Sequence, residues 1–383
     1  MKKILIMANT LYSGGAERVL QTVLNQLSEK KYDITLYSMH REKIDHSIYK
    51  KKFHYKVVFD DKFKNILFIR TIYKYYTKLK GFIFTRYSSR LFYFLFIHGK
   101  YDVEIAFIEG ESTKVVAGST NKDSRKIAWV HTDLERNPWT SFLYQGDKDE
   151  AMHYACFDKI ICVSQATKDS FIRKYNIDSE KVIVHYNPVD ANNIRKLAFE
   201  REVSNDFRKD VVQIMAVGRL VPEKGFDRLL IAAQNLMQEG LKFQLHIIGM
   251  GNQYELLHNY IIKHNMQDYV VLHGYQTNPY ALMKNGDVLI CSSRAEGYSL
   301  VIAEAMILGL AIVTTSCAGP CELILNGQHG ILVDNSVDGI RNGLKLVISD
   351  RDLLEKYKIL SAERGLTFDI QENIRELEHI IDE

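Results

Sequence analysis

Two glutamates with seven residues between them, Glu296 and Glu304, follow the apolar run 287–291 in the segment RAEGYSLVIAEA. If the run is a strand, Glu296 falls in the next loop, the amides of residues 297–300 form a helix N-terminus, and Glu304 lies inside that helix. A carboxylate accepts two hydroxyl donors, so one glutamate suits a sugar ring and the other a ribose diol, with a diphosphate on the amides between them. Helix capping is an alternative role for Glu296. A purely structural role is harder to assign to Glu304, because its neighbours are apolar and an unpaired buried carboxylate is costly.

Two cations flank a second loop, in the segment VGRLVPEKGF. Arg219 comes directly after an expected strand and Lys224 directly before an expected helix, so both can converge on one phosphate group. A surface loop with two solvated charges is the alternative.

A glycine pair, Gly14 and Gly15, follows the first apolar run and precedes an amphipathic segment. Glycines allow backbone amides to approach an anion at a helix start. A turn that needs positive φ would have the same sequence, and the third glycine of a dinucleotide-binding loop is missing.

These loops require strands that end at one edge of a sheet. Short apolar runs alternate with helix-length amphipathic segments along the chain, which predicts an α/β protein with parallel sheets wrapped by helices. Helices should begin near Gly15 and Gln165. Strands are expected at Lys2–Asn9, Ile34–Ser38, Val103–Ile108, Ile127–Val130, Lys159–Val163, Val182–His185, Val212–Val217, Gln244–Ile248, Val270–His273, Asp287–Cys291, Ala311–Thr315 and Ile331–Val333.

Length and composition indicate two domains in a reducing compartment. The chain has 383 residues, a length too great for one ordinary hydrophobic core. Its 46% hydrophobic and 25% charged residues are typical of a globular protein. A proline turn and a polar segment between Asn187 and Asp210 mark the boundary, so we expect domains at 1–187 and 188–365 and a closing helix at 366–383. Five cysteines form no CxxC pair and no signal peptide precedes them, so we expect neither disulfides nor zinc, and a cytoplasmic location.

The net charge of +3 conceals a polarised chain. The first hundred residues hold 20 Lys/Arg against 7 Asp/Glu, or +13, which leaves −10 for the remainder. Residues 62–100 combine nine basic and twelve aromatic residues with no acid, which favours contact with an anionic membrane surface. No apolar run reaches the roughly 20 residues of a membrane span. The alternative to membrane contact is that these residues form amphipathic helices whose aromatic faces join the core. No nucleic-acid-binding module accompanies the segment, so no nucleic-acid partner is expected.

The ordered motifs resemble those of the retaining GT-B glycosyltransferases of family 4 over nearly the whole chain. The resemblance is carried by the segments GGAER, VGRLVPEKGFDRLL, HIIGMGNQYELL, VLHGYQTNPY, EGYSLVIAE and TFDIQENIRELEHII. It implies two Rossmann-like domains that face each other across a cleft, an acceptor-binding N-domain, a donor-binding C-domain, and a final helix, from about Phe368, that returns to the N-domain.

The resemblance also implies roles for individual residues. Arg219 and Lys224 match the pair that binds the donor diphosphate, Glu304 matches the ribose-binding glutamate, and Glu296 matches the glutamate beside the donor sugar. His131, near the reacting sugar, completes the expected catalytic set, although a histidine satisfied at a strand end is the alternative. The remaining expected donor contacts are Gly15, Gly218, Gly274, Tyr275, Asn278, Gly297, Tyr298, Ser299 and Leu300.

The function that this resemblance implies is transfer, with retention of configuration, of a hexose or N-acetylhexosamine from a nucleotide diphosphate sugar to a lipid-linked saccharide. We expect UDP as the nucleotide, the inner face of the cell membrane as the location, and cell-surface polysaccharide as the product. The sequences DKD at 147–149 and DRD at 350–352 spell DxD but follow no expected strand, so we expect no metal. A nucleotide-sugar epimerase, a glycoside phosphorylase and a non-catalytic subunit of a polysaccharide assembly complex remain alternatives.

Overall fold

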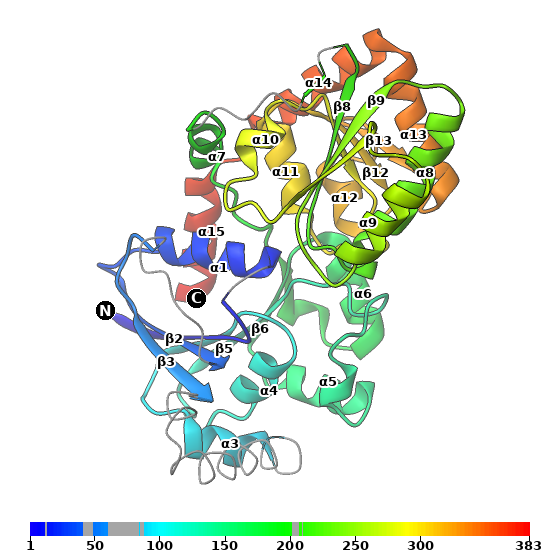
Figure 1. Ribbon diagram of the computed structural model, residues 1–383. Coiled ribbons are helices and arrows are strands. Elements are labelled where there is room, and N and C mark those ends of the chain that lie inside the picture. The colour runs from blue at the N-terminus through cyan, green and yellow to red at the C-terminus, as the bar shows by residue number, and fades with distance from the viewer. Residues whose placement is uncertain (12–13, 41–48, 60–83, 85–87, 201–206, 209) are drawn as a thin grey trace, which may run out of the picture. The chain divides into compact units, whose positions relative to one another are not determined.

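A computed structural model describes residues 1–11, 14–40, 49–59, 84, 88–200, 207–208 and 210–383. The chain divides into two compact units (Figure 1). Unit 1 contains Met1–Tyr186 together with Asn373–Glu383, and unit 2 contains Asn187–Glu372.

Unit 1 is built on a parallel sheet whose described strands lie in the order β3-β2-β1-β4-β5-β6-β7. The central strand β1 carries four consecutive side chains, Ile4 to Met7, that are fully buried, as expected for a strand covered on both faces. The strands are β1 Lys2–Ala8, β2 Tyr32–His40, β3 His54–Phe59, β4 Val103–Ala106, β5 Arg125–Val130, β6 Lys159–Cys162 and β7 Val182–Val184.

In the described part of unit 1, helices follow most of these strands. They are α1 Gly15–Gln26, α3 Ser89–Phe96, α4 Glu111–Ala117, α5 Asp147–Ala155 and α6 Gln165–Tyr175, with short 3₁₀ turns at Ser141–Leu143 and Ser179–Lys181. The last helix, α15 Ile370–Asp382, returns to unit 1 from Asn373 onward. It buries Ile374, Leu377 and Ile381, and the hydroxyl of Tyr32 donates to Asp382 at 2.9 Å.

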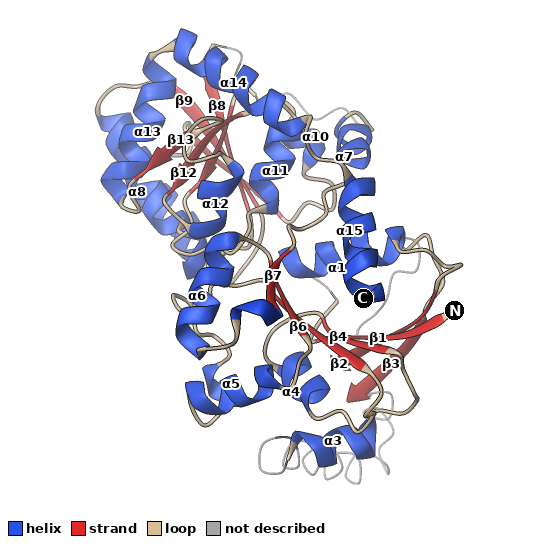
Figure 2. Ribbon diagram, turned by 180° about the vertical axis from the view of Figure 1, so that it is seen from behind, coloured by secondary structure: helices blue, strands red, loops and turns tan. Residues whose placement is uncertain are grey.

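Unit 2 has a second parallel sheet, in the order β10-β9-β8-β11-β12-β13. Helices cover both faces, with α8 and α13 on one side and α10, α11 and α14 on the other (Figure 2). The strands are β8 Val212–Val217, β9 Phe243–Ile248, β10 Val270–Gly274, β11 Val288–Cys291, β12 Ala311–Thr315 and β13 Ile331–Val333. The helices are α7 Ala191–Ala198, α8 Phe226–Gln238, α9 Tyr254–Lys263, α10 Tyr280–Met283, α11 Leu300–Ile307, α12 Ala318–Leu323, α13 Val337–Ser349 and α14 Arg351–Gly365.

Every strand that the sequence predicts is present, with ends that differ by at most two residues, and helices begin at Gly15 and Gln165 as expected. Strand β3 was not predicted; it is an edge strand in which only Val58 is buried. Helix α7 was not predicted either, because it lies inside the stretch expected to be polar. This helix buries Ala191, Ile194 and Ala198 and is capped by Asp190, whose carboxylate accepts from the Asn193 amide at 3.0 Å.

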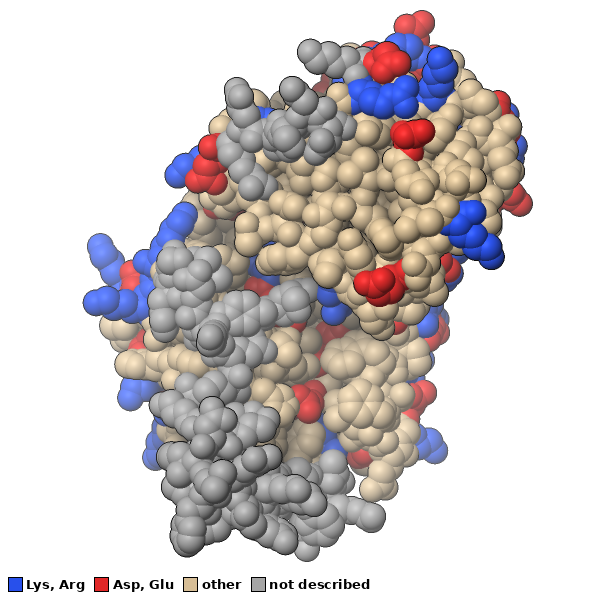
Figure 3. Space-filling model, in the orientation of Figure 1, with Lys and Arg blue, Asp and Glu red and all other residues tan. Residues whose placement is uncertain are grey.

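Most of the basic aromatic segment, residues 62–100, lies outside the described residues. Its described end forms α3, in which Phe92 and Tyr93 are buried while Phe94 is 65% exposed. On the face drawn in Figure 3, acidic and basic side chains of the described residues are interspersed. None of the helices in the described ranges has the length and apolar character needed to cross a bilayer.

Candidate functional site

The candidate site in unit 2 is built from two loops that approach closely. The loop after β8 forms a 3₁₀ turn, Pro222–Lys224, that ends at Gly225 with φ +68. A Cβ at Gly225 would lie 2.2 Å from the carbonyl oxygen of Ser292, so only glycine allows this approach. The Ser292 hydroxyl donates to the Lys224 carbonyl at 2.9 Å. Lys224 is therefore held beside the loop that follows β11.

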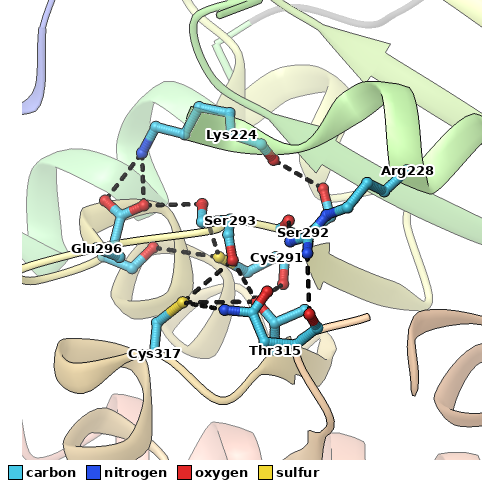
Figure 4. Close-up of polar contacts among 10 residues, drawn as sticks. Lys224, Arg228, Cys291, Ser292, Ser293, Glu296, Thr315 and Cys317 are labelled. Carbon is cyan, nitrogen blue, oxygen red and sulfur yellow. Dashed lines mark hydrogen bonds and ion pairs between the residues drawn. The ribbon is translucent and has the colours of Figure 1, made fainter. Parts of the chain in front are cut away.

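An ion pair between Lys224 and Glu296 lies where the two loops meet (Figure 4). The Lys224 Nζ donates to Oε1 of Glu296 at 2.8 Å and to Oε2 at 2.6 Å, and the Ser293 hydroxyl also donates to Oε2, at 2.9 Å. Burial, the largest single influence, acts to lower the pKa of Lys224, but the carboxylate of Glu296 and the thiol of Cys291 together outweigh it, and the pKa is raised above its ordinary 10.5. Lys224 is thus a cation at any physiological pH.

The backbone beneath this pair is held by the half-buried Arg228 and by the buried Thr315 and Cys317 (Figure 4). Arg228 donates to the carbonyl of Ser292 at 2.7 Å and to that of Asn335 at 3.0 Å. The carbonyl of Ser293 accepts from the Thr315 hydroxyl at 2.7 Å and from the Cys317 thiol at 3.1 Å. Because the bonds to Ser292 and Ser293 fix the backbone just before Glu296, the carboxylate is positioned before any ligand arrives.

Arg294 ties the same loop to the Lys224 turn from the other side. Its guanidinium makes a two-pronged pair with Asp227, at 2.8 and 2.7 Å, and its amide donates to the carbonyl of Glu223 at 2.7 Å. The hydrogen bond from Arg294 is the largest influence on Asp227 and lowers the pKa of that carboxyl. The cation and the carboxylate of the candidate site therefore sit on loops that are joined on both sides.

Glu304 lies in α11 and is only 4% exposed. The Tyr280 hydroxyl donates to its Oε1 at 2.9 Å, which gives this buried carboxylate a partner. The helix begins at Leu300, with Ser299 as its N-cap. The sequence predicted a start at Gly297, three residues earlier. The delay has a local cause, because the carbonyl of Glu296 accepts from the Gly319 amide at 3.3 Å and so belongs to a loop.

The other expected donor contacts of unit 2 lie at the ends of neighbouring strands. Gly218 and the exposed Arg219 directly follow β8, Gly274 ends β10, and Tyr275 beyond it is 69% exposed. Asn278 donates to the Leu197 carbonyl of α7 at 2.8 Å, while Tyr298 and Ser299 are buried. The carboxyl ends of parallel strands meet at one sheet edge, so the expected donor contacts of unit 2 share that edge.

The expected residues of unit 1 lie at the corresponding edge of the first sheet. His131 follows β5, and its Nε2 lies 2.9 Å from the carbonyl of Phe107. A carbonyl only accepts, so Nε2 carries the proton, and burial, the largest influence, lowers the pKa of this histidine. Gly15 begins α1 and is exposed. The structure gives each unit its own set, His131 and Gly15 in unit 1 and the others in unit 2.

Several residues that build the site were not predicted. Ser293 and Tyr280 hold the expected glutamates directly, and Arg228 holds the backbone of Ser292; these contacts join residues 3, 24 and 64 positions apart, and no motif in the sequence marks them. In unit 1, Glu109 is 1% exposed and accepts from the amide of His131 at 2.9 Å. The only sequence signal for Glu109 is its place just after a strand.

Both DxD segments lie at helix starts. Asp147 and Asp149 are in the first turn of α5, and Asp350 caps α14 by accepting from the Leu353 amide at 2.9 Å. Carboxylates at these positions are stabilised by the helix dipole. Within the described ranges, no group of three or more His, Cys, Asp or Glu side chains could hold a metal ion.

Comparison with known proteins identifies relatives along the whole chain. An N-acetylgalactosaminyltransferase from Campylobacter jejuni, named for a diphospho-undecaprenol-linked acceptor, is 28% identical over 96% of both chains. The amylovoran biosynthesis glycosyltransferase AmsD of Erwinia amylovora is 24% identical, over 87% of this chain and 86% of its own. The structure of Anabaena Alr3699/HepE in complex with UDP-glucose aligns over the full length of both chains with a TM-score of 0.75 and 18% identity.

Two family models together match nearly all of the sequence. The Glycosyltransferase Family 4 model matches residues 13–193, and the Glycosyl transferases group 1 model matches residues 199–363. Two Rossmann-like units of parallel sheet, with the fold of solved GT-B structures, agree with both matches. The chain is a glycosyltransferase and belongs to family 4 of the GT-B fold.

Proposed function

We propose that this glycosyltransferase moves a hexose or N-acetylhexosamine from a UDP-sugar to a lipid-linked saccharide, with retention of configuration. The observation that carries the proposal is the Lys224–Glu296 pair on two loops fixed by Arg228 and Arg294. A preorganised cation at the carboxyl edge of a parallel sheet suits a diphosphate, and a carboxylate beside it suits the hydroxyls of the attached sugar.

The proposed chemistry follows from these positions. The bond between the anomeric carbon and the diphosphate oxygen breaks, and Lys224 and Arg219 stabilise the charge on the departing UDP. The acceptor hydroxyl attacks from the face that the diphosphate leaves, a glycosidic bond forms, and the departing phosphate takes the proton. Glu304, oriented by the Tyr280 hydroxyl, binds the ribose diol. No side-chain nucleophile and no metal ion enters this scheme.

The relatives support the choice of acceptor. One is named for a saccharide on diphospho-undecaprenol and another for the biosynthesis of amylovoran, and a third was solved with UDP-glucose. We therefore propose that the acceptor is a saccharide on a polyprenyl diphosphate, that the product is cell-surface polysaccharide, and that the enzyme works at the cytoplasmic face of the membrane. Residues 62–100 would supply the contact with anionic lipid, and the N-terminal unit would bind the acceptor.

The first test is a thermal-shift screen with UDP, GDP and ADP sugars, followed by transfer with the best donor. Only UDP and its sugars should stabilise the protein, and Lys224→Ala and Glu296→Ala should abolish transfer without unfolding it. NMR of the product should show the anomeric configuration of the donor; an inverted product would refute retention. Conversion of the donor without acceptor would indicate an epimerase instead.

For the membrane contact, replacement of Lys74, Lys78, Lys80 and Arg86 by glutamate should weaken binding to anionic vesicles, and unchanged binding would reject this segment.

A further inference from the structure

An exposed tryptophan stands at the edge of unit 1 where the candidate residues of that unit lie. Trp139 is 36% exposed and belongs to the loop between β5 and α5, the loop that begins with His131. Large aromatic side chains bury much apolar area, and this one remains in contact with solvent. Its position is therefore a feature to be explained.

A buried carboxylate fixes the indole of Trp139. The indole Nε1 donates to Oε1 of Glu109 at 3.2 Å, and the other oxygen of Glu109 accepts from the backbone amide of His131 at 2.9 Å. Glu109 is 1% exposed, so a single buried group sets both the tryptophan and the start of the loop. Trp139 and His131 are thus held in a fixed relation.

The backbone under the ring is shaped to receive it. Gly110 has φ +92, and a Cβ there would lie 3.2 Å from Cη2 of Trp139. Any other residue would be strained by this backbone conformation, and its Cβ would crowd the ring together with Leu143 and Thr140. The indole rests on this glycine with its only polar atom already bonded, so what it offers to solvent is a rigid apolar face.

We infer that Trp139 is a platform on which a pyranose ring of the acceptor saccharide stacks, and that Glu109 is a positioning residue for it. The inference rests on the proposed function and names an acceptor contact for it. A pyranose has one face of C–H groups that packs on an aromatic ring, while its hydroxyls stay available to polar groups. A lipid chain needs no oriented ring, and the fixed geometry lowers the entropy cost of binding a rigid ligand.

Fluorescence offers a direct test because the chain has only two tryptophans. The other, Trp129, is 1% exposed, so Trp129→Phe leaves Trp139 as the single reporter. Titration of this variant with the methyl glycosides of galactose, glucose and N-acetylgalactosamine should shift its emission saturably with at least one of them. Calorimetry with UDP on the same protein reports the donor site separately. UDP binding without any saccharide response would overturn the platform and leave the proposed function intact; loss of UDP binding would count against the proposed function.

Kinetics of variants that keep Trp129 provide a second test. Trp139→Ala should raise the acceptor KM roughly tenfold, whereas UDP affinity should stay unchanged and Trp139→Phe should retain most of the acceptor affinity. Phe142→Ala is the matched control, since Phe142 is 75% exposed on the same loop and should contribute nothing to the acceptor KM.

Glu109→Gln tests the positioning role, because an amide offers one acceptor oxygen where the carboxylate offers two. In the Trp129→Phe background it should lower the fluorescence anisotropy of Trp139 and raise the acceptor KM. An unchanged KM in both Trp139→Ala and Glu109→Gln would refute the inference.

Discussion

Replacing Glu296 by glutamine removes the charge of this side chain and keeps its shape. In the wild-type protein the Lys224 ammonium is bonded to both carboxylate oxygens, at 2.8 and 2.6 Å. A diphosphate that binds Lys224 therefore approaches a carboxylate as well as a cation. The variant should bind UDP more tightly and transfer sugar more slowly, because the repulsion disappears while the carboxylate beside the donor sugar is lost.

The size of the effect follows from Coulomb's law. With a phosphate charge roughly 5 Å from the carboxylate and an effective dielectric constant of about 20, the repulsion is about 3 kcal/mol. The side chain of Glu296 is 12% exposed and that of Lys224 26%, so solvent screens part of this energy. We expect about 1.4 kcal/mol to remain, which is roughly a tenfold gain in UDP affinity. Transfer should fall by roughly 100-fold or more, the usual cost of one preorganised group.

Calorimetry with UDP and a transfer assay on the same preparation measure both effects. Glu223→Gln is the matched control, because it removes one negative charge from an exposed side chain beside Lys224 and should leave both values nearly unchanged. A pH series adds a second readout. Burial alone lowers the pKa of Lys224, so UDP binding by the Glu296→Gln variant should fall at a lower alkaline pH than in the wild type. Weaker or equal UDP affinity in a folded Glu296→Gln protein would refute the reasoning.

Three further predictions concern stability and cofactors. Burial, the largest influence, lowers the pKa of His185 from 6.5 to about 4, so its contribution to stability is complete above pH 6.5 and is lost as the pH falls toward 4. His185→Gln should remove roughly 3 kcal/mol of pH dependence from the unfolding free energy in that window, and an unaltered pH profile would contradict this. Arg294→Met should lower the urea-unfolding free energy by about 1 kcal/mol, because the Asp227 carboxylate, about a third exposed, loses its partner. Glu239→Gln removes a carboxylate from a different ion pair and should leave the affinity for UDP unchanged. Transfer should persist in EDTA; its loss and recovery with Mn²⁺ would overturn the expectation of a metal-free site.

The fold was predictable because its strands are short apolar runs bounded by polar residues. Strand β1 contains a run of five apolar residues, Ile4 to Ala8, and the ends of β8, β12 and β13 were predicted to the residue. The edge strand β3 could not be recognised in the same way, because its buried pattern contains a single fully buried residue. The linker helix α7 was not recognised in the sequence for a related reason, because its buried face consists of only three small or branched side chains.

The site was predictable only as far as its residues lie in local motifs. The pairing of Lys224 with Glu296 joins residues 72 positions apart and depends on Gly225, whose close approach to Ser292 no pattern reveals. Supporting residues such as Arg228 act through backbone carbonyls, which carry no signal in the sequence. The cleft expected between the two domains, and the roles expected for Glu304 and His131, stay predictions.

The position of a bound nucleotide tests the central claim most directly. In a crystal structure of the protein with UDP, the β-phosphate should lie within hydrogen-bond distance of Lys224 Nζ and the Arg219 guanidinium, with the ribose hydroxyls on Glu304. A UDP molecule bound elsewhere on the chain, with the Lys224–Glu296 pair untouched, would contradict the account.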